Sequence, residues 1–85
     1  MRYTVTIKRS AQRDIAQLHP RVRVAVDQRI ASLADDPRPP GAAPLKGKWR
    51  GSWRLRSGEF RIIYAIDDRA RTVTVAEVGP RGSIY

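Results

Sequence analysis

Three arginines stand among mostly apolar side chains in the stretch RLRSGEFRIIYAIDD, residues 54–68. They are Arg54, Arg56 and Arg61. A guanidinium presents a planar fork of N–H donors that matches the oxygens of a phosphate. Because side chains alternate between the two faces of a strand, packing the intervening apolar residues into a core turns all three arginines to the other face. The pattern predicts an anion-binding site, with an ordinary solvated strand face as the alternative.

The charge of the whole chain supports the first interpretation. Seventeen Lys and Arg stand against eight Asp and Glu, which gives a formal net charge of +9. Residues 38–61 carry seven of the bases and one of the acids. Such a focused excess indicates a polyanionic partner, either nucleic acid or an acidic protein, although a compositional bias toward arginine is the alternative. Glu59 and Glu77 are placed to neutralise part of this charge.

Other kinds of chemistry lack the residues they need. The chain has no cysteine and a single histidine, His19, so neither a disulfide nor a thiolate or histidine metal centre is expected. Asp67 and Asp68 are interpreted as turn-shaping residues and not as a metal pair. We therefore expect no metal and no cofactor. No apolar run suits a signal peptide or a membrane span, which predicts a soluble cytoplasmic protein with no membrane partner.

A length of 85 residues predicts one domain spanning residues 1–85. RYTVTIKR alternates like a half-buried strand, and an amphipathic helix follows over residues 9–19 with Ser10 as its N-cap. Pro20 suits the first turn of a second helix, which the prolines of DDPRPP end. Three strands are then expected, at residues 52–57, 59–67 and 71–79.

The element order β-α-α-β-β-β predicts an α+β fold. Short joins between the last three strands favour hairpins and an antiparallel sheet. Two consecutive helices are expected to pack together on one face of this sheet and leave the other face open to a ligand. The arginines are predicted to lie on that open face.

A chain of this length and order that contains LKG, RLRSGEFRIIYAIDD and a closing VGPRGSIY resembles the RelE/ParE superfamily of bacterial type II toxins. It is most similar to the RelE-like branch. The resemblance covers essentially the whole chain. It implies the RelE-like fold and a ribosome-dependent mRNA endoribonuclease that inhibits translation, in which the ribose 2′-OH attacks the adjacent phosphate without a metal.

The resemblance also implies roles for individual residues. Arg61 matches the arginine that binds the scissile phosphate, Arg81 the one that assists the leaving oxygen, and Tyr85 the tyrosine that orients or stacks on the substrate. Arg54 lies where family members often carry a basic residue, in some a lysine proposed to deprotonate the nucleophile. A guanidinium stays protonated, so Arg54 is expected to act by electrostatic stabilisation. The residues expected to bind RNA are Lys46, Lys48, Arg50 and Arg56.

The partners implied by the resemblance are the ribosome, mRNA and an acidic cognate antitoxin. The toxin alone is expected to be a monomer that forms a heteromeric complex with the antitoxin. Two alternatives stay open at this point. One is a ParE-like inhibitor of DNA gyrase, and the other is a catalytically degenerate toxin that only binds its antitoxin or nucleic acid.

Overall fold

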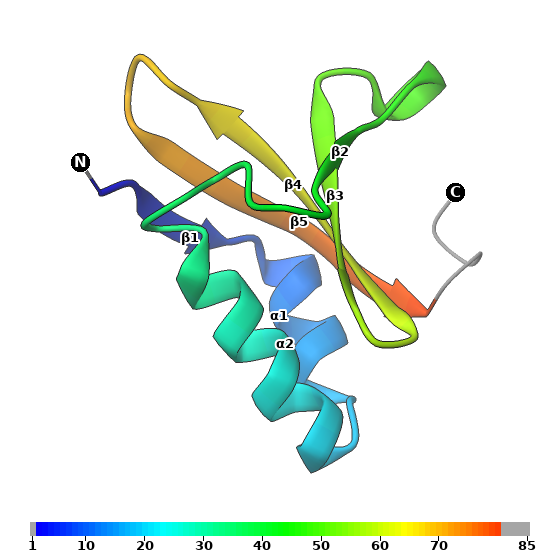
Figure 1. The fold of residues 1–85 in the computed structure, drawn as a ribbon. Coiled ribbons are helices and arrows are strands. Elements are labelled where there is room, and N and C mark those ends of the chain that lie inside the picture. Colours follow the sequence, from blue (N-terminus) through cyan, green and yellow to red (C-terminus); the bar gives the residue numbers. More distant parts are fainter. Residues whose placement is uncertain (1, 81–85) are drawn as a thin grey trace.

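Residues 2–80 are described by a computed structural model of the protein, and Met1 and residues 81–85 lie outside the description. The chain begins with one strand and two helices and continues with four strands (Figure 1). The first three elements are β1 Thr4–Ile7, α1 Arg9–Ala16 and α2 Pro20–Ser32. They are followed by β2 Ala43–Pro44, the 3-10 helix η1 Gly47–Trp49, β3 Ser52–Ser57, β4 Phe60–Asp67 and β5 Thr72–Pro80.

The strands form one five-stranded sheet in the order β1-β5-β4-β3-β2. The hairpins β3–β4 and β4–β5 are antiparallel, as predicted. The short strand β2 also pairs antiparallel with β3, but β1 runs parallel to β5. The prediction of a wholly antiparallel sheet was therefore wrong. The two helices carry the chain from β1 to the far edge of the sheet, and the returning meander brings β5 beside β1 in the same direction. The short strand β2 and helix η1 lie in a segment that the sequence predicted as a plain connection.

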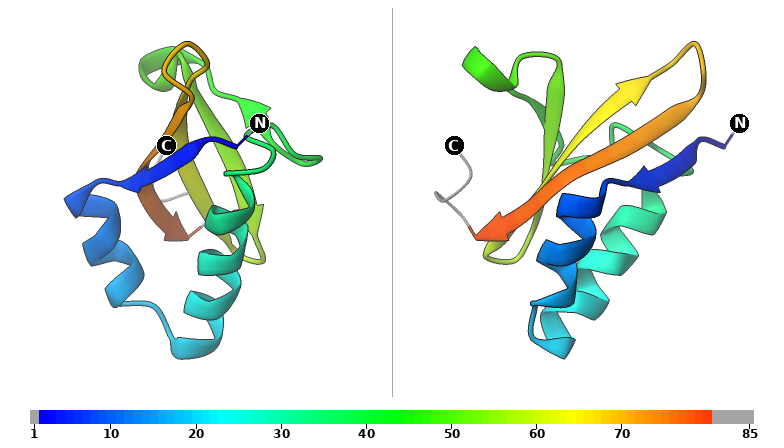
Figure 2. Two further views of the ribbon diagram at one scale, coloured as in Figure 1. Left: turned by 90° about the vertical axis from the view of Figure 1, so that its left-hand side faces the viewer. Right: turned by 180° about the vertical axis from the view of Figure 1, so that it is seen from behind.

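Both helices cover the same face of the sheet, as expected (Figure 2). The core between the helices and the sheet is built from the inward positions of each element. Leu55, Ile62 and Tyr64 come from the central strands and are fully buried. Val26 and Leu33 come from α2 and the residue after it, and they are equally buried. In the described chain, neither helix is long and apolar enough to cross a membrane.

The two helix starts differ from each other. His19 caps α2, because its Nδ1 accepts a hydrogen bond from the Arg21 amide at 3.2 Å, and Pro20 occupies the first turn as predicted. The prediction that Ser10 caps the first helix was wrong. Lys8 holds the cap position without a side-chain hydrogen bond, and the Ser10 hydroxyl donates instead to the Ala76 carbonyl of β5 at 3.0 Å.

Two polar contacts anchor the loop that follows α2. The buried Tyr64 hydroxyl donates to the Pro37 carbonyl at 2.8 Å. Arg38 forms a fork with the Asp68 carboxylate at 2.8 and 3.1 Å, and Tyr3 donates to the same carboxylate at 2.6 Å. These bonds hold the pKa of Asp68 down at about 2, with the Arg38 hydrogen bond as the main cause.

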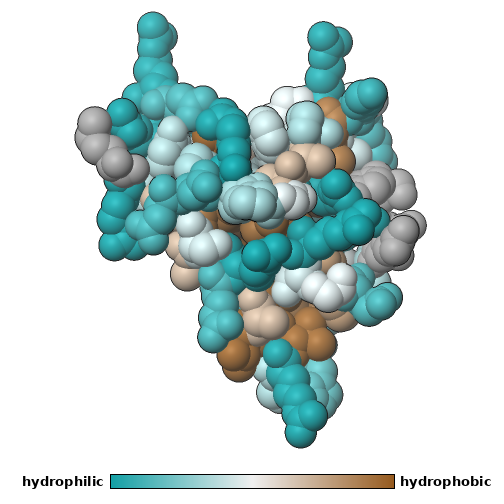
Figure 3. All heavy atoms as spheres, viewed as in Figure 1, coloured by the Kyte–Doolittle hydropathy of each residue, from teal (hydrophilic) through white to brown (hydrophobic). Residues whose placement is uncertain are grey.

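In the view of Figure 3 the surface is largely hydrophilic, and apolar residues gather in its lower part.

Candidate nucleic-acid interface

The predicted arginines meet on the sheet face that points away from the helices. Strand register places them in two adjacent rows across β3, β4 and β5. Arg54 pairs with Ile63, which pairs with Glu77, and this is the first row. Arg56 pairs with Arg61, which pairs with Gly79, and this is the second row. We call these six residues the arginine face.

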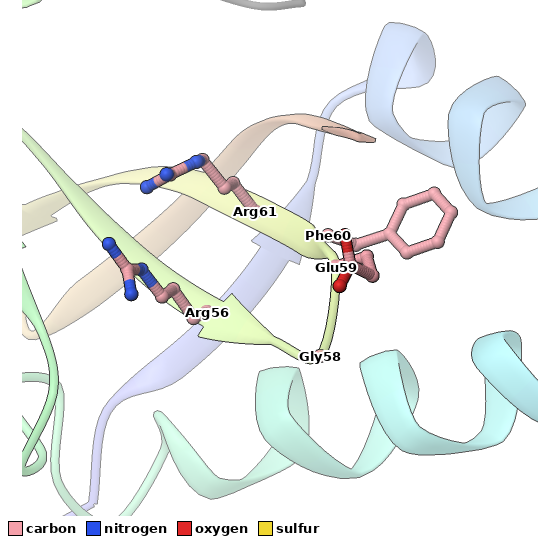
Figure 4. Close-up of a pocket in the computed structure, with 5 residues that line it drawn as sticks. All are labelled: Arg56, Gly58, Glu59, Phe60 and Arg61. Atoms are coloured by element: carbon pink, nitrogen blue, oxygen red, sulfur yellow. The ribbon is translucent and has the colours of Figure 1, made fainter. Parts of the chain in front are cut away.

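The arginines on this face differ in exposure. Arg61 is only 6% exposed, whereas Arg56 directly opposite is exposed and Arg54 is half-buried. Figure 4 shows the Arg56 and Arg61 side chains extending in similar directions from neighbouring strands, while Phe60 points the other way, toward the helices. The face is also less open than the sequence predicted, since Ile63 between the arginines is fully buried. A charge in such a partly desolvated place interacts more strongly with an anion than one in bulk water.

Contacts from the turn and from α2 position the end of β3. Gly58 and Glu59 form a two-residue turn, and Gly58 has φ +59°, the left-handed conformation that a tight hairpin needs at this position. The Arg29 guanidinium of α2 donates through Nε and Nη2 to the Arg56 carbonyl at 3.1 and 3.0 Å. The tight turn and the Arg29 hydrogen bonds thus hold the backbone at the end of β3, next to Arg56.

A β-bulge decides which way Glu77 points. Tyr64 pairs with Val75 and Ile63 pairs with Glu77, so Ala76 is an extra residue in β5. Without it, Glu77 would lie on the core-facing side of the sheet with Val75, because side chains alternate with a period of two. The bulge reverses this alternation, and Glu77 lies on the arginine face.

Two side chains of α1 hold the bulge. Ser10 donates to the Ala76 carbonyl at 3.0 Å, and the Asp14 carboxylate accepts from the Val78 amide at 3.1 Å. Residues four apart lie on the same side of a helix, so α1 presents both groups to β5 together. The sequence carries a trace of this feature, since the buried valines of β5 are spaced by two and then by three residues, Val73, Val75 and Val78. The prediction overlooked that spacing.

The other predicted site residues lie apart from the two rows or outside the described chain. Lys46, Lys48 and Arg50 are exposed in the segment between β2 and β3, around η1. The Lys48 ammonium lies 5.8 Å from the centre of the Trp49 ring. Arg81 and Tyr85 fall outside residues 2–80, so their expected roles remain predictions.

Neither glutamate neutralises the arginine face through an ion pair. Within residues 2–80 the ion pairs are Arg2–Asp35, Arg23–Asp27 and Arg38–Asp68, and neither Glu59 nor Glu77 takes part in one. The described chain also has no group of three His, Asp or Glu residues that could hold a metal ion. Among residues 2–80, the charged groups of the arginine face are the guanidiniums of Arg54, Arg56 and Arg61 and the carboxylate of Glu77.

Comparison with known proteins identifies the family of this chain. The family described as ParE toxin of the type II toxin–antitoxin system, parDE, matches residues 5–85. The chain belongs to this family of type II toxins.

Individual relatives narrow the assignment to the RelE-like toxins. Toxin RelG of Mycobacterium tuberculosis is 36% identical over 100% of this chain and 98% of its own length. Toxin RelE of the same organism is 31% identical over 98% of this chain and 86% of its own. A chain of the crystal structure of the M. tuberculosis toxin–antitoxin complex RelBE2 superposes with a TM-score of 0.85 at 33% identity, covering 95% of this chain and all of that one. The predicted superfamily and the RelE-like fold are confirmed.

Proposed function

We propose that this toxin is a ribosome-dependent endoribonuclease that cleaves mRNA and thereby inhibits translation. The observation that supports this most directly is the arginine face. Arg56 and Arg61 lie opposite each other in one row of this face, and Arg54 lies in the adjacent row. The net charge of +9 and the relatives named RelE and RelG support the same activity. Residues 1–85 act as a single toxin domain in this proposal.

The cations of the face suit attack of a ribose 2′-OH on the adjacent phosphorus. Negative charge builds up on the phosphoryl oxygens as the new bond forms, and Arg61 binds these oxygens. Arg54 and Arg56 hold the flanking phosphates, while Arg81 stabilises the leaving 5′ oxygen and Tyr85 orients the nucleotide. The reaction yields a 2′,3′-cyclic phosphate and a 5′-OH end. Removing one such donor typically lowers the rate by about 10²–10³-fold.

The basic loop extends the contact with RNA in this proposal. Lys46, Lys48 and Arg50 bind the backbone beyond the cleavage point, and their contribution weakens with salt as counterions compete for the phosphates. An acidic antitoxin segment inhibits the toxin by pairing its carboxylates with the same arginines. The RelBE2 relative is a toxin–antitoxin complex, which supports such a heteromeric partner.

The test is induced expression of the wild type, the Arg61→Ala/Arg81→Ala variant and an Arg69→Ala control, followed by primer extension on cellular mRNA. Arg69 is an exposed arginine in the β4–β5 turn, outside the arginine face. We expect cuts in translated mRNA for the wild type and the control, and none for the double variant. Circular dichroism and antitoxin binding of the purified variants check that they are folded.

Other outcomes lead to different functions. Growth arrest with intact mRNA and an SOS response would favour a ParE-like inhibitor of DNA gyrase. Absence of both growth arrest and mRNA cleavage, with antitoxin binding retained, would favour a catalytically degenerate toxin that only binds its antitoxin or nucleic acid. Cleavage that persists in the double variant would contradict the role given to the arginines.

A further inference from the structure

Attack by a 2′-OH requires a group that accepts its proton, and arginines cannot do this. A guanidinium remains protonated at every physiological pH, so it has no lone pair to offer. Arg54, Arg56 and Arg61 can therefore bind phosphate and stabilise charge without removing the proton. A positioned base typically contributes about 10²–10⁴-fold to the rate. The arginine face needs a proton acceptor of another residue type.

Glu77 is the carboxylate that the sheet register places among these arginines. It stands in the same row as Arg54, with only Ile63 between them. Neighbouring strands are about 5 Å apart, so the backbones that carry Arg54 and Glu77 are separated by about 10 Å. Arg61 is a diagonal neighbour of Glu77, because its own partner on β5, Gly79, lies two residues further along. Gly79 contributes no side chain of its own at this register position beside Arg61.

Four other candidate bases in the described chain are placed less well than Glu77. The only histidine, His19, caps α2 at the junction of the helices. Tyr64 points into the core and donates to the Pro37 carbonyl, and burial raises its pKa to about 12. Asp67 lies at the far end of β4, where its Oδ1 accepts from the Ala70 amide. Glu59 is exposed in the β3–β4 turn and lines a small pocket with Arg56 and Arg61, but both guanidiniums extend away from this turn (Figure 4).

The bulge at Ala76 determines the orientation of Glu77. A regular β5 would turn this carboxylate into the core beside Val75, where an ionised group is costly. Ser10 and Asp14 of α1 hold the two backbone groups that flank Glu77, the Ala76 carbonyl and the Val78 amide. Bulges occur frequently beside active sites, where they redirect a side chain. Glu77 is half-buried and forms no ion pair within residues 2–80, so its oxygens remain available to a ligand.

We propose that Glu77, turned to the arginine face by the bulge at Ala76, is the general base that takes the proton from the attacking 2′-OH. A carboxylate oxygen of Glu77 accepts the proton as the 2′ oxygen bonds to phosphorus. The bond from phosphorus to the 5′ oxygen breaks, and that oxygen takes a proton from water. Glu77 then returns its proton to solvent. This inference rests on the proposed endoribonuclease activity and names the residue that completes it.

Single-turnover cleavage of mRNA on programmed ribosomes tests the inference with purified wild-type protein and the variants Glu77→Gln, Glu77→Asp and Arg61→Ala. Glu59→Gln is the matched control, since it removes the same charge from the neighbouring turn. We expect Glu77→Gln to slow the cleavage step by about 10²-fold or more. The half-saturating concentration measured for Glu77→Gln should stay unchanged or fall, because the substitution removes a negative charge from a basic surface. Glu77→Asp should restore part of the rate, and the acid limb of the pH–rate profile should be absent in Glu77→Gln.

The outcomes separate the inference from the function on which it rests. Wild-type cleavage that Arg61→Ala abolishes and Glu77→Gln leaves intact or accelerates would overturn the role of Glu77 and keep the nuclease. Such a result would mean that Glu77 only moderates the positive charge of the face. Absence of cleavage by the wild type would overturn the proposed function and the inference together. An equal loss in Glu59→Gln and Glu77→Gln would also overturn the inference, since it would reflect net charge alone.

Discussion

Replacing Tyr64 by phenylalanine tests how the loop after α2 is held against the sheet. The Tyr64 hydroxyl donates to the Pro37 carbonyl at 2.8 Å, and both residues are buried. Tyr64→Phe keeps the ring in the core and leaves that carbonyl without its donor. A buried polar group that loses its partner costs about 1–3 kcal/mol. For a domain of this size, each kcal/mol lowers the melting temperature by about 4–8 °C.

The pH dependence gives the same prediction a second test. Burial raises the pKa of Tyr64 to about 12, whereas a tyrosine in the unfolded chain ionises near pH 10. Folding therefore favours the protonated form, so the stability from this group is complete below about pH 10 and falls as the pH rises to about 12. The wild type should lose about 2–3 kcal/mol over this interval through Tyr64. The phenylalanine variant has no such group and should not lose that part.

Urea unfolding of both proteins at pH 7 and at several values from pH 9.5 upward measures the two effects. Lysines and the other tyrosines titrate alike in both chains, so the difference in unfolding free energy isolates Tyr64. We expect the wild type to be more stable at pH 7 and this advantage to shrink steadily above pH 10. Equal stability at pH 7, or a difference that does not change with pH, would refute the reasoning.

Two further predictions concern the Asp68 carboxylate after β4 and the bulge in β5. The pKa of Asp68 is held at about 2 by its bonds to Arg38 and Tyr3, so its stabilising effect is present above about pH 4 and lost as the pH falls toward 2. Asp68→Asn should unfold more easily than the wild type at pH 6, with the two acid-denaturation curves converging near pH 2; curves that stay apart would argue against the bonded carboxylate. Ser10→Ala removes the donor to the Ala76 carbonyl and should cost about 0.5–1.5 kcal/mol in thermal unfolding. Because this bond holds the bulge, mRNA cleavage at a temperature where the variant is fully folded should also fall, and unchanged cleavage would separate the bulge from the activity.

Some features of the site follow from side-chain alternation alone. Leu55 and Ile62 face the core, so the arginines beside them in the sequence must face outward together. The short β3–β4 turn then sets Arg56 directly opposite Arg61. These relations are local, since they depend on a period of two and a two-residue turn. The resemblance to the family also rested in part on this stretch of sequence.

Other features arose only when distant segments met. The spacing of the buried valines in β5 is only a trace of the direction of Glu77. The pairing with β4, together with Ser10 and Asp14 of α1, turns this residue to the arginine face. The parallel pairing of β1 with β5 likewise depends on the path of the chain through two helices. Sequence alone thus determined the fold class and the grouping of the three arginines on one face of the sheet, because alternation and turn chemistry are local. Tertiary structure decided where the carboxylate lies, because a bulge exists only between paired strands.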